Sequence, residues 1–137
     1  MFETLLWGGE EDWKIRISVL WLFSEIAFLG TMVLSILRPD VIEQIMAGEI
    51  EGMKIVPELL LVYAVLVLFP LVMAFPTLIL KDSINRWANI IMGTVGVILS
   101  LVGLSQNLAY AYSVLMWVSK IVVAMLIVWY AYKWSKA

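Results

Sequence analysis

Two charged residues, Glu25 and Lys120, lie inside long apolar stretches of this sequence. Charge in a hydrocarbon environment is costly, so an ionisable residue there indicates either a functional site or a buried partner. A tryptophan and a serine shortly precede each charge. Together they give six candidates for binding a proton or a ligand: Trp21, Ser24, Glu25, Trp117, Ser119 and Lys120.

Three interpretations of the two charges stay open. If the first and last apolar stretches are helices, Glu25 and Lys120 differ in depth by about one turn, which a lysine side chain can span. They then form either a proton- or ligand-binding site at the bundle centre or a structural ion pair between the two helices. In the third interpretation, Lys120 extends to the interface and Glu25 stays protonated. A buried ion pair is weak evidence for stability, because desolvation can outweigh the attraction.

Composition places the chain among membrane proteins. Hydrophobic residues make up 64% of its 137 residues and charged residues 15%, with a mean hydropathy of +1.00. The net charge of −2 argues against a nucleic-acid partner. The absence of cysteine and histidine removes disulfides, thiolate nucleophiles and the usual zinc and haem ligands. We therefore expect no enzyme activity, no metal site and no cofactor.

Four stretches are long enough to cross a bilayer, which takes roughly 20 helical residues. They cover about 17–37, 56–80, 88–105 and 108–132. The sequence predicts an all-α fold, a four-transmembrane-helix bundle in the lipid bilayer, in which residues 1–137 form a single domain.

The distribution of lysine and arginine predicts the orientation of the bundle. One side carries six of these residues and the other only Arg38 and Lys54. Since basic residues concentrate in cytoplasmic loops, both termini are expected to be cytoplasmic. The six residues are Lys14, Arg16, Lys81, Arg86, Lys133 and Lys136.

The first loop, on the extracytoplasmic side, is expected to contain its own structure. Residues 39–48 begin with proline and end with glycine, as a short helix does, and their apolar residues share one face. This pattern predicts a two-turn interfacial helix. Residues 49–55 alternate in polarity around Gly52, which is typical of a turn or a short hairpin.

The third apolar stretch carries a seam of small and polar residues spaced three or four apart. Such seams allow helices to approach closely, with amides and hydroxyls bonding across the contact. The partner is left open between the first or second helix and another subunit, and this seam leads us to expect a homo-oligomer. Its members are Asn89, Gly93, Gly96, Ser100, Gly103 and Asn107.

The second apolar stretch contains Pro70 and Pro76. Each proline leaves a carbonyl without its helical partner and kinks the helix. Broken helices line some transport sites, but the kinks can equally serve shape alone.

Three segments resemble a family of small four-span prokaryotic membrane proteins that is known as a domain of unknown function. They are Asn85–Ile91, Gly48–Ile55 and Val128–Trp134. This resemblance implies the fold and a multi-pass location in a prokaryotic plasma membrane, and no activity. Residues 25–31, EIAFLGT, are similar to the segment around the proton-binding glutamate of small multidrug-resistance transporters, although the long first loop and Lys120 depart from that family.

Two functions follow as hypotheses. The first is a small oligomeric transporter or channel-like carrier that moves a small solute or ion through a site at Glu25 and Lys120. The second is a membrane scaffold or accessory subunit in which the two charges specify helix packing. A solvent-filled cavity that reaches Glu25 would favour the carrier, and a dry contact between the charges would favour the scaffold.

Overall fold

A computed structural model of the chain describes residues 10–134. Within this range the fold is an all-α bundle of four long helices with a short fifth helix between the first two, as the sequence predicts. The elements are α2 (Glu10–Ile36), α3 (Pro39–Met46), β1 (Glu49–Ile50), β2 (Met53–Lys54), α4 (Pro57–Ile79), α5 (Asp82–Gln106) and α6 (Ala111–Trp134).

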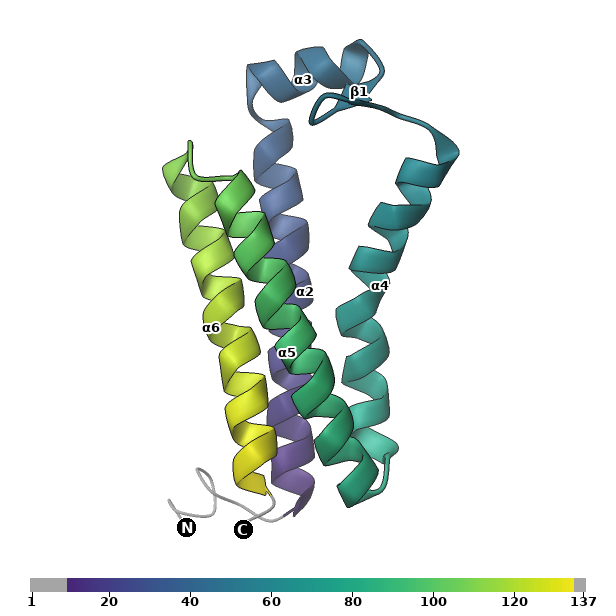
Figure 1. Cartoon of the computed structure of the whole chain (residues 1–137), viewed down its shortest axis with the longest axis vertical. Helices are drawn as coiled ribbons and strands as arrows, with labels where there is room; N and C mark the ends of the chain where they lie inside the picture. Colours follow the sequence, from purple (N-terminus) through teal and green to yellow (C-terminus); the bar gives the residue numbers. More distant parts are fainter. Residues whose placement is uncertain (1–9, 135–137) are drawn as a thin grey trace.

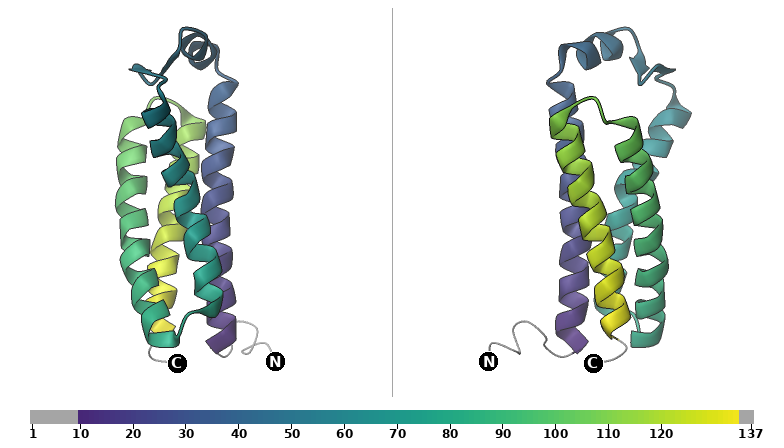
Figure 2. Two further views of the ribbon diagram at one scale, coloured as in Figure 1. Left: turned by 90° about the vertical axis from the view of Figure 1, so that its right-hand side faces the viewer. Right: turned by 60° about the vertical axis from the view of Figure 1, so that its left-hand side comes forward.

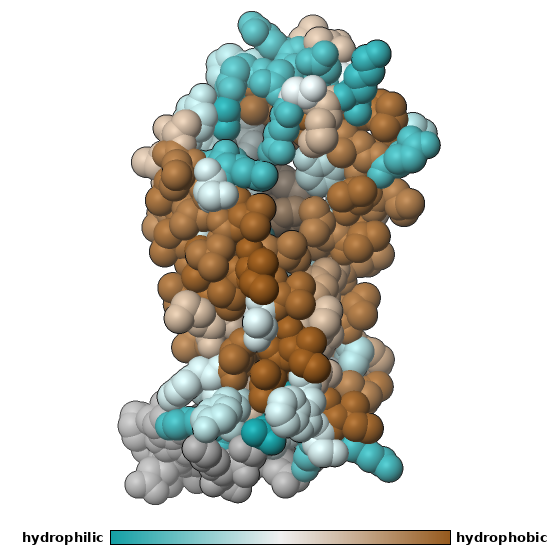
Figure 3. All heavy atoms as spheres, viewed as in Figure 1, coloured by the Kyte–Doolittle hydropathy of each residue, from teal (hydrophilic) through white to brown (hydrophobic). Residues whose placement is uncertain are grey.

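Four of the described helices, α2, α4, α5 and α6, are long and apolar enough to cross a membrane. Their outward side chains form an apolar belt, with hydrophilic residues above it on α3 and the β1–β2 hairpin (Figure 3). The chain is therefore a multi-pass membrane protein by length and composition.

Two helices begin earlier than the apolar stretches that predict them. α2 starts at Glu10, and its first turns bury Trp13 and Ile17 against the core. α5 starts at Asp82, and its first turns bury Asn85 and Asn89. In both cases the extension is polar on one side, so a stretch defined by hydropathy starts later along the chain than the helix does.

The helices form an antiparallel bundle with two different ends. α2 begins and α6 ends at one end, together with the turn between α4 and α5, and we refer to this as the base (Figures 1 and 2). α3 and the hairpin cover the opposite end, which we refer to as the cap. α5 packs along α6, and α2 packs along both α4 and α6. α4 barely touches α5, and the two ribbons diverge toward the cap (Figure 1).

The loop between α2 and α4 has the predicted structure. α3 begins with Pro39, and its backbone leaves the helix at Gly48, which has a positive φ of 78°. β1 and β2 pair antiparallel through a turn in which Glu51 and Gly52 both have positive φ. This is the two-residue turn whose twist matches a hairpin.

The small-residue seam of α5 packs against α6 of the same chain. A Cβ on Gly93 would lie 2.8 Å from Cγ2 of Val128, and one on Gly103 would overlap the ring of Trp117. The glycines of the seam therefore pack on α6, and Asn89 of the same seam bonds to Trp21 of the first long helix. The homo-oligomer that the seam led us to expect stays a prediction.

Candidate functional site

A cavity of about 320 Å³ is lined by residues of the four long helices and of the β1–β2 hairpin, most of them in the half of the bundle nearer the cap. Its walls combine aromatic and aliphatic side chains with a few polar ones, which is typical of ligand-binding cavities. Wall residues on two helices, Val62 of α4 and Leu99 and Val102 of α5, are exposed. The cavity therefore opens between α4 and α5, where Figure 3 shows a hollow below the cap.

Lys120 forms part of the cavity wall. Its position in α6 puts it about 14 Å from the cap end of that helix. The residue is 8% exposed, and its Nζ lies 4.0 Å from the ring centre of Trp117 and 4.3 Å from that of Phe28. Within the described residues this ammonium has no hydrogen bond and no ion pair. Two aromatic faces thus stabilise the charge, while its three N–H donors lack acceptors.

Glu25 is buried but does not line the cavity. It is 3% exposed, and neither carboxylate oxygen has a hydrogen-bond donor among residues 10–134. Lys120 is the charged residue whose field reaches it, yet no oxygen of Glu25 lies within 4.0 Å of the Lys120 Nζ. The two charges therefore interact across a gap rather than through a contact ion pair.

Of the other residues predicted for the site, some line the cavity and one does not. Trp21, Ser24 and Trp117 line the cavity, whereas Ser119 does not and donates its hydroxyl to the Leu115 carbonyl of its own helix at 2.9 Å. The seam on α5 likewise contains residues that line the cavity and residues that do not. Gly96, Ser100, Gly103 and Asn107 line the cavity, and Asn89 and Gly93 lie closer to the base.

A buried hydrogen-bond network closes the base side of the bundle. Trp21 Nε1 donates to Asn89 Oδ1 at 2.7 Å, and Asn89 Nδ2 donates to Asn85 Oδ1 at 2.7 Å. Asn85 Nδ2 in turn donates to the Thr77 carbonyl at 2.6 Å. These bonds join α2, α5 and α4 between fully buried residues, so the helices are tightly connected below the cavity and separated beside it.

At the cap, Arg38 connects the end of α2 to α6. Its guanidinium holds Asp40 through two bonds, of 2.6 and 3.1 Å, and donates to the Tyr112 hydroxyl at 3.2 Å. It also lies 3.6 Å from the ring centre of Tyr110. The bond to Arg38 lowers the pKa of Asp40, and the bonds to Asp40 and Tyr112 raise the pKa of Arg38. This cluster fixes one side of the cap, and the side above α4 has no equivalent among the described residues.

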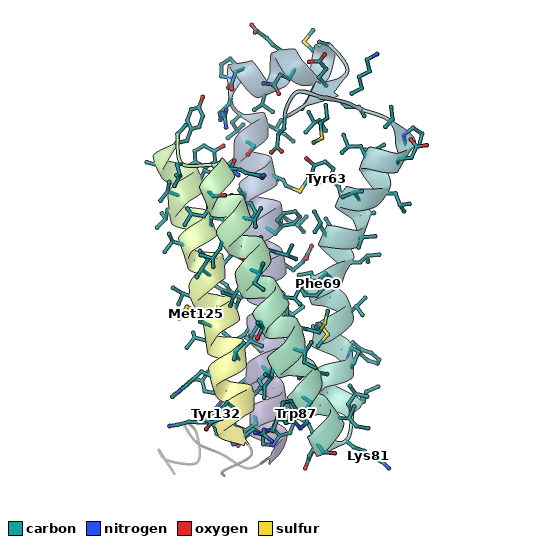
Figure 4. All side chains as sticks on the ribbon, viewed as in Figure 1. Tyr63, Phe69, Lys81, Trp87, Met125 and Tyr132 are labelled. Atoms are coloured by element: carbon teal, nitrogen blue, oxygen red, sulfur yellow. The ribbon has the colours of Figure 1, made fainter. Side chains whose placement is uncertain are left out.

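Sequence reasoning missed the wall that α4 contributes. Tyr63 and Phe69 lie on the side of α4 that faces the other helices, whereas Met125 of α6 faces outward (Figure 4). α4 is apolar all round, so its sequence gives no signal of which face is inward. On α2 a signal exists: Phe28 and Thr31 continue the helical spacing of Trp21 and Ser24.

The cavity wall carries groups that can bind a ligand. No group of three His, Cys, Asp or Glu side chains that could hold a metal ion is present in residues 10–134. What the cavity offers is one buried ammonium, aromatic faces and hydroxyls, next to a carboxylate that the cavity does not reach.

Comparison with known proteins identifies a family and no activity. A family model described as a family of unknown function (DUF6326) matches residues 4–137. No curated protein matches the chain, and no solved structure does.

Proposed function

This chain belongs to the DUF6326 family of unknown function, and from its own residues we propose that it is a small membrane carrier that binds a solute beside Lys120. The observation that supports this proposal is the cavity that reaches the Lys120 ammonium from the cap half of the bundle. A charged donor without acceptors, placed at the wall of an apolar cavity, is a binding group for a solute.

The asymmetry of the bundle fits one state of a carrier. The cavity is open between α4 and α5 on the cap side, and the Trp21–Asn89 network closes the base. Release of the solute toward the base requires the hydrogen bonds of this network to break and α4 and α5 to approach each other in the cap half. Pro70 lies on the wall, where α4 passes from its packed half to its separated half, and the missing backbone hydrogen bond makes this a natural place to bend.

Glu25 is suited to carry a proton during this cycle. With a solute absent, the fields of Glu25 and Lys120 offset each other across the gap. A solute that changes the charge at Lys120 changes the energy of the Glu25 carboxylate, because the low dielectric of the membrane interior lets the two act on each other strongly. Solute movement and proton movement are thereby coupled.

The scaffold remains the second candidate function, because the cavity does not reach Glu25, as the sequence-based criterion for a carrier required. A structural ion pair would bring the two charges into contact, yet they lie more than 4.0 Å apart and Lys120 faces open space. The scaffold predicts that Glu25→Ala and Lys120→Ala each destabilise the protein and that exchanging the two charges partly restores stability.

The carrier proposal is tested in liposomes that contain a pH-sensitive dye. Purified protein is challenged in turn with small organic anions, cations and neutral solutes. We expect at least one class to change the internal pH in a protein-dependent way, Glu25→Gln to abolish the change while retaining its circular dichroism, and Lys81→Met at the base turn to leave it intact. Wild-type protein that moves no solute would end the proposal.

We also keep homo-oligomerisation in the plasma membrane of a prokaryotic cell as part of the proposal, with both termini cytoplasmic. Mass photometry in mild detergent tests the oligomer, and a monomer at all concentrations would contradict it.

A further inference from the structure

We infer that the solute is an amphipathic organic anion, which enters from the bilayer between α4 and α5 and places its anionic head on Lys120. This inference rests on the proposed function, because it names the class of solute that the same cavity accepts.

The charge on the cavity wall selects the head group. Lys120 is the charged residue on the deep part of the wall, and the Glu25 carboxylate lies outside it. An anionic head supplies the acceptors that the ammonium lacks, and hydrogen bonds between two charged groups are the strongest kind available. A cationic head would meet the ammonium with no carboxylate in reach. Glu51, the other charged wall residue, belongs to the β1–β2 turn at the cap, far from Lys120 along the helix axis.

The rest of the wall selects the body of the solute. Phe28 and Trp117 flank the ammonium, and Leu66 and Phe69 of α4 line the same cavity. The volume of about 320 Å³ is at the small end of ligand-binding cavities, so a short alkyl or single-ring body fits it.

The opening faces the bilayer rather than water alone. The wall residues Val62 on α4 and Leu99 and Val102 on α5 are all apolar, exposed and within helices long and apolar enough to span the membrane. A solute with an apolar body concentrates in the bilayer and reaches these wall residues from the side. Its anionic head then moves into the cavity to Lys120.

Binding of an anion has a consequence for Glu25. Once the anionic head neutralises the Lys120 ammonium, no positive charge is left to balance the negative Glu25 carboxylate. Glu25 then takes up one proton from water, so that the interior of the bundle carries no net charge. Within residues 10–134, the helices that line the cavity place no other charged side chain on its wall to replace Lys120 in this role. α4 contributes Tyr63 as its titratable wall residue, and α5 contributes none between Arg86 and Gln106. The inference thus predicts one proton taken up for each anion bound, which requires that Glu25 is charged before the anion binds.

The first experiment compares three solutes of the same chain length on the wild-type protein in phosphatidylcholine nanodiscs. They are octanesulfonate, octyltrimethylammonium and octanol, and empty nanodiscs give the background. We expect saturable binding of octanesulfonate, at least about tenfold tighter than that of octanol, and none of octyltrimethylammonium. Because only wild-type protein is used, the result does not depend on whether a variant folds. Tighter binding of the ammonium compound, or equal binding of all three, would overturn the inference.

The second experiment tests the two charges with matched variants. Lys120→Met is expected to weaken octanesulfonate binding at least about tenfold, and Lys81→Met, the same change at the exposed base turn, to leave it unchanged. Lys120→Arg retains a charge and is expected to recover most of the binding. In weakly buffered solution, an indicator dye should report one proton taken up per octanesulfonate by the wild type and none by Glu25→Gln.

The outcomes separate the inference from the function. Octanesulfonate binding at Lys120 without any flux in liposomes supports the inference and removes the carrier. Flux of a cation or a neutral solute, with no binding of octanesulfonate, supports the carrier and overturns the inference.

Discussion

The Trp117 ring contacts both the Lys120 ammonium and Gly103. The Lys120 Nζ lies 4.0 Å from the centre of the Trp117 ring, and the same ring packs on Gly103 of α5, where a Cβ would overlap it. The absence of a side chain at residue 103 thus lets the indole lie where it can stabilise a buried charge, which connects the packing seam to the binding site.

Gly103→Ala is therefore expected to destabilise the protein. The added methyl forces the Trp117 ring to move, and overpacking of this kind costs about 1–3 kcal/mol. Gly96→Ala is the matched control, because its Cβ would lie 3.6 Å from the Ala124 Cβ, an ordinary contact, and the change favours the helix. The free energy of unfolding in mixed micelles measures both. Equal stability of the two variants would contradict the role of the close contact.

The seam also shows where prediction from sequence succeeds and where it stops. Its periodicity identifies the face of α5 that packs, because spacing of three and four residues depends only on helix geometry. It does not identify α6 as the partner, because that depends on how the helices rotate and assemble. The same limit applies to Glu25 and Lys120. The depth of each residue in the bundle follows from counting residues along its helix. Two other features depend on side-chain direction and on the position of α4: the gap between the two charges, and the cavity that Lys120 lines and Glu25 does not.

The network at the base gives a second test. Asn89→Ala removes the acceptor of Trp21 Nε1 and a partner of Asn85, all of them buried, so we expect a loss of about 1–2 kcal/mol in the free energy of unfolding. Asn107→Ala, whose side chain bonds only to the Gly103 carbonyl of its own helix, should cost less. A larger loss for Asn107→Ala would show that the network does not hold the base together.

The cap gives a prediction for pH. The bond to Arg38 lowers the pKa of Asp40 from its ordinary value of 3.8, so the folded state favours the charged carboxylate. Its contribution to stability is fully present above pH 3.8 and is lost as the pH falls through the lowered pKa. Thermal unfolding between acid and neutral pH should show the wild type losing more stability on acidification than Asp40→Asn does. Parallel pH profiles for the two proteins would contradict this role of Asp40.

Cysteine substitution tests the cavity itself, because the natural chain contains no cysteine. Ser100 and Ser113 are both buried serines on spanning helices, at 5% and 2% exposure, but only Ser100 lines the cavity. Each single-cysteine variant therefore reports access from the opening to its own position, with Lys120 left in place.

The most direct measurement is the rate at which small charged thiosulfonates modify these two cysteines in liposomes. We predict that Ser100→Cys reacts, that it reacts faster with a sulfonate-bearing reagent than with an ammonium-bearing one because Lys120 attracts the anion, and that Ser113→Cys stays unmodified. A Ser100→Cys protein that resists both reagents, or that prefers the cationic one, would contradict an open cavity whose binding group is Lys120.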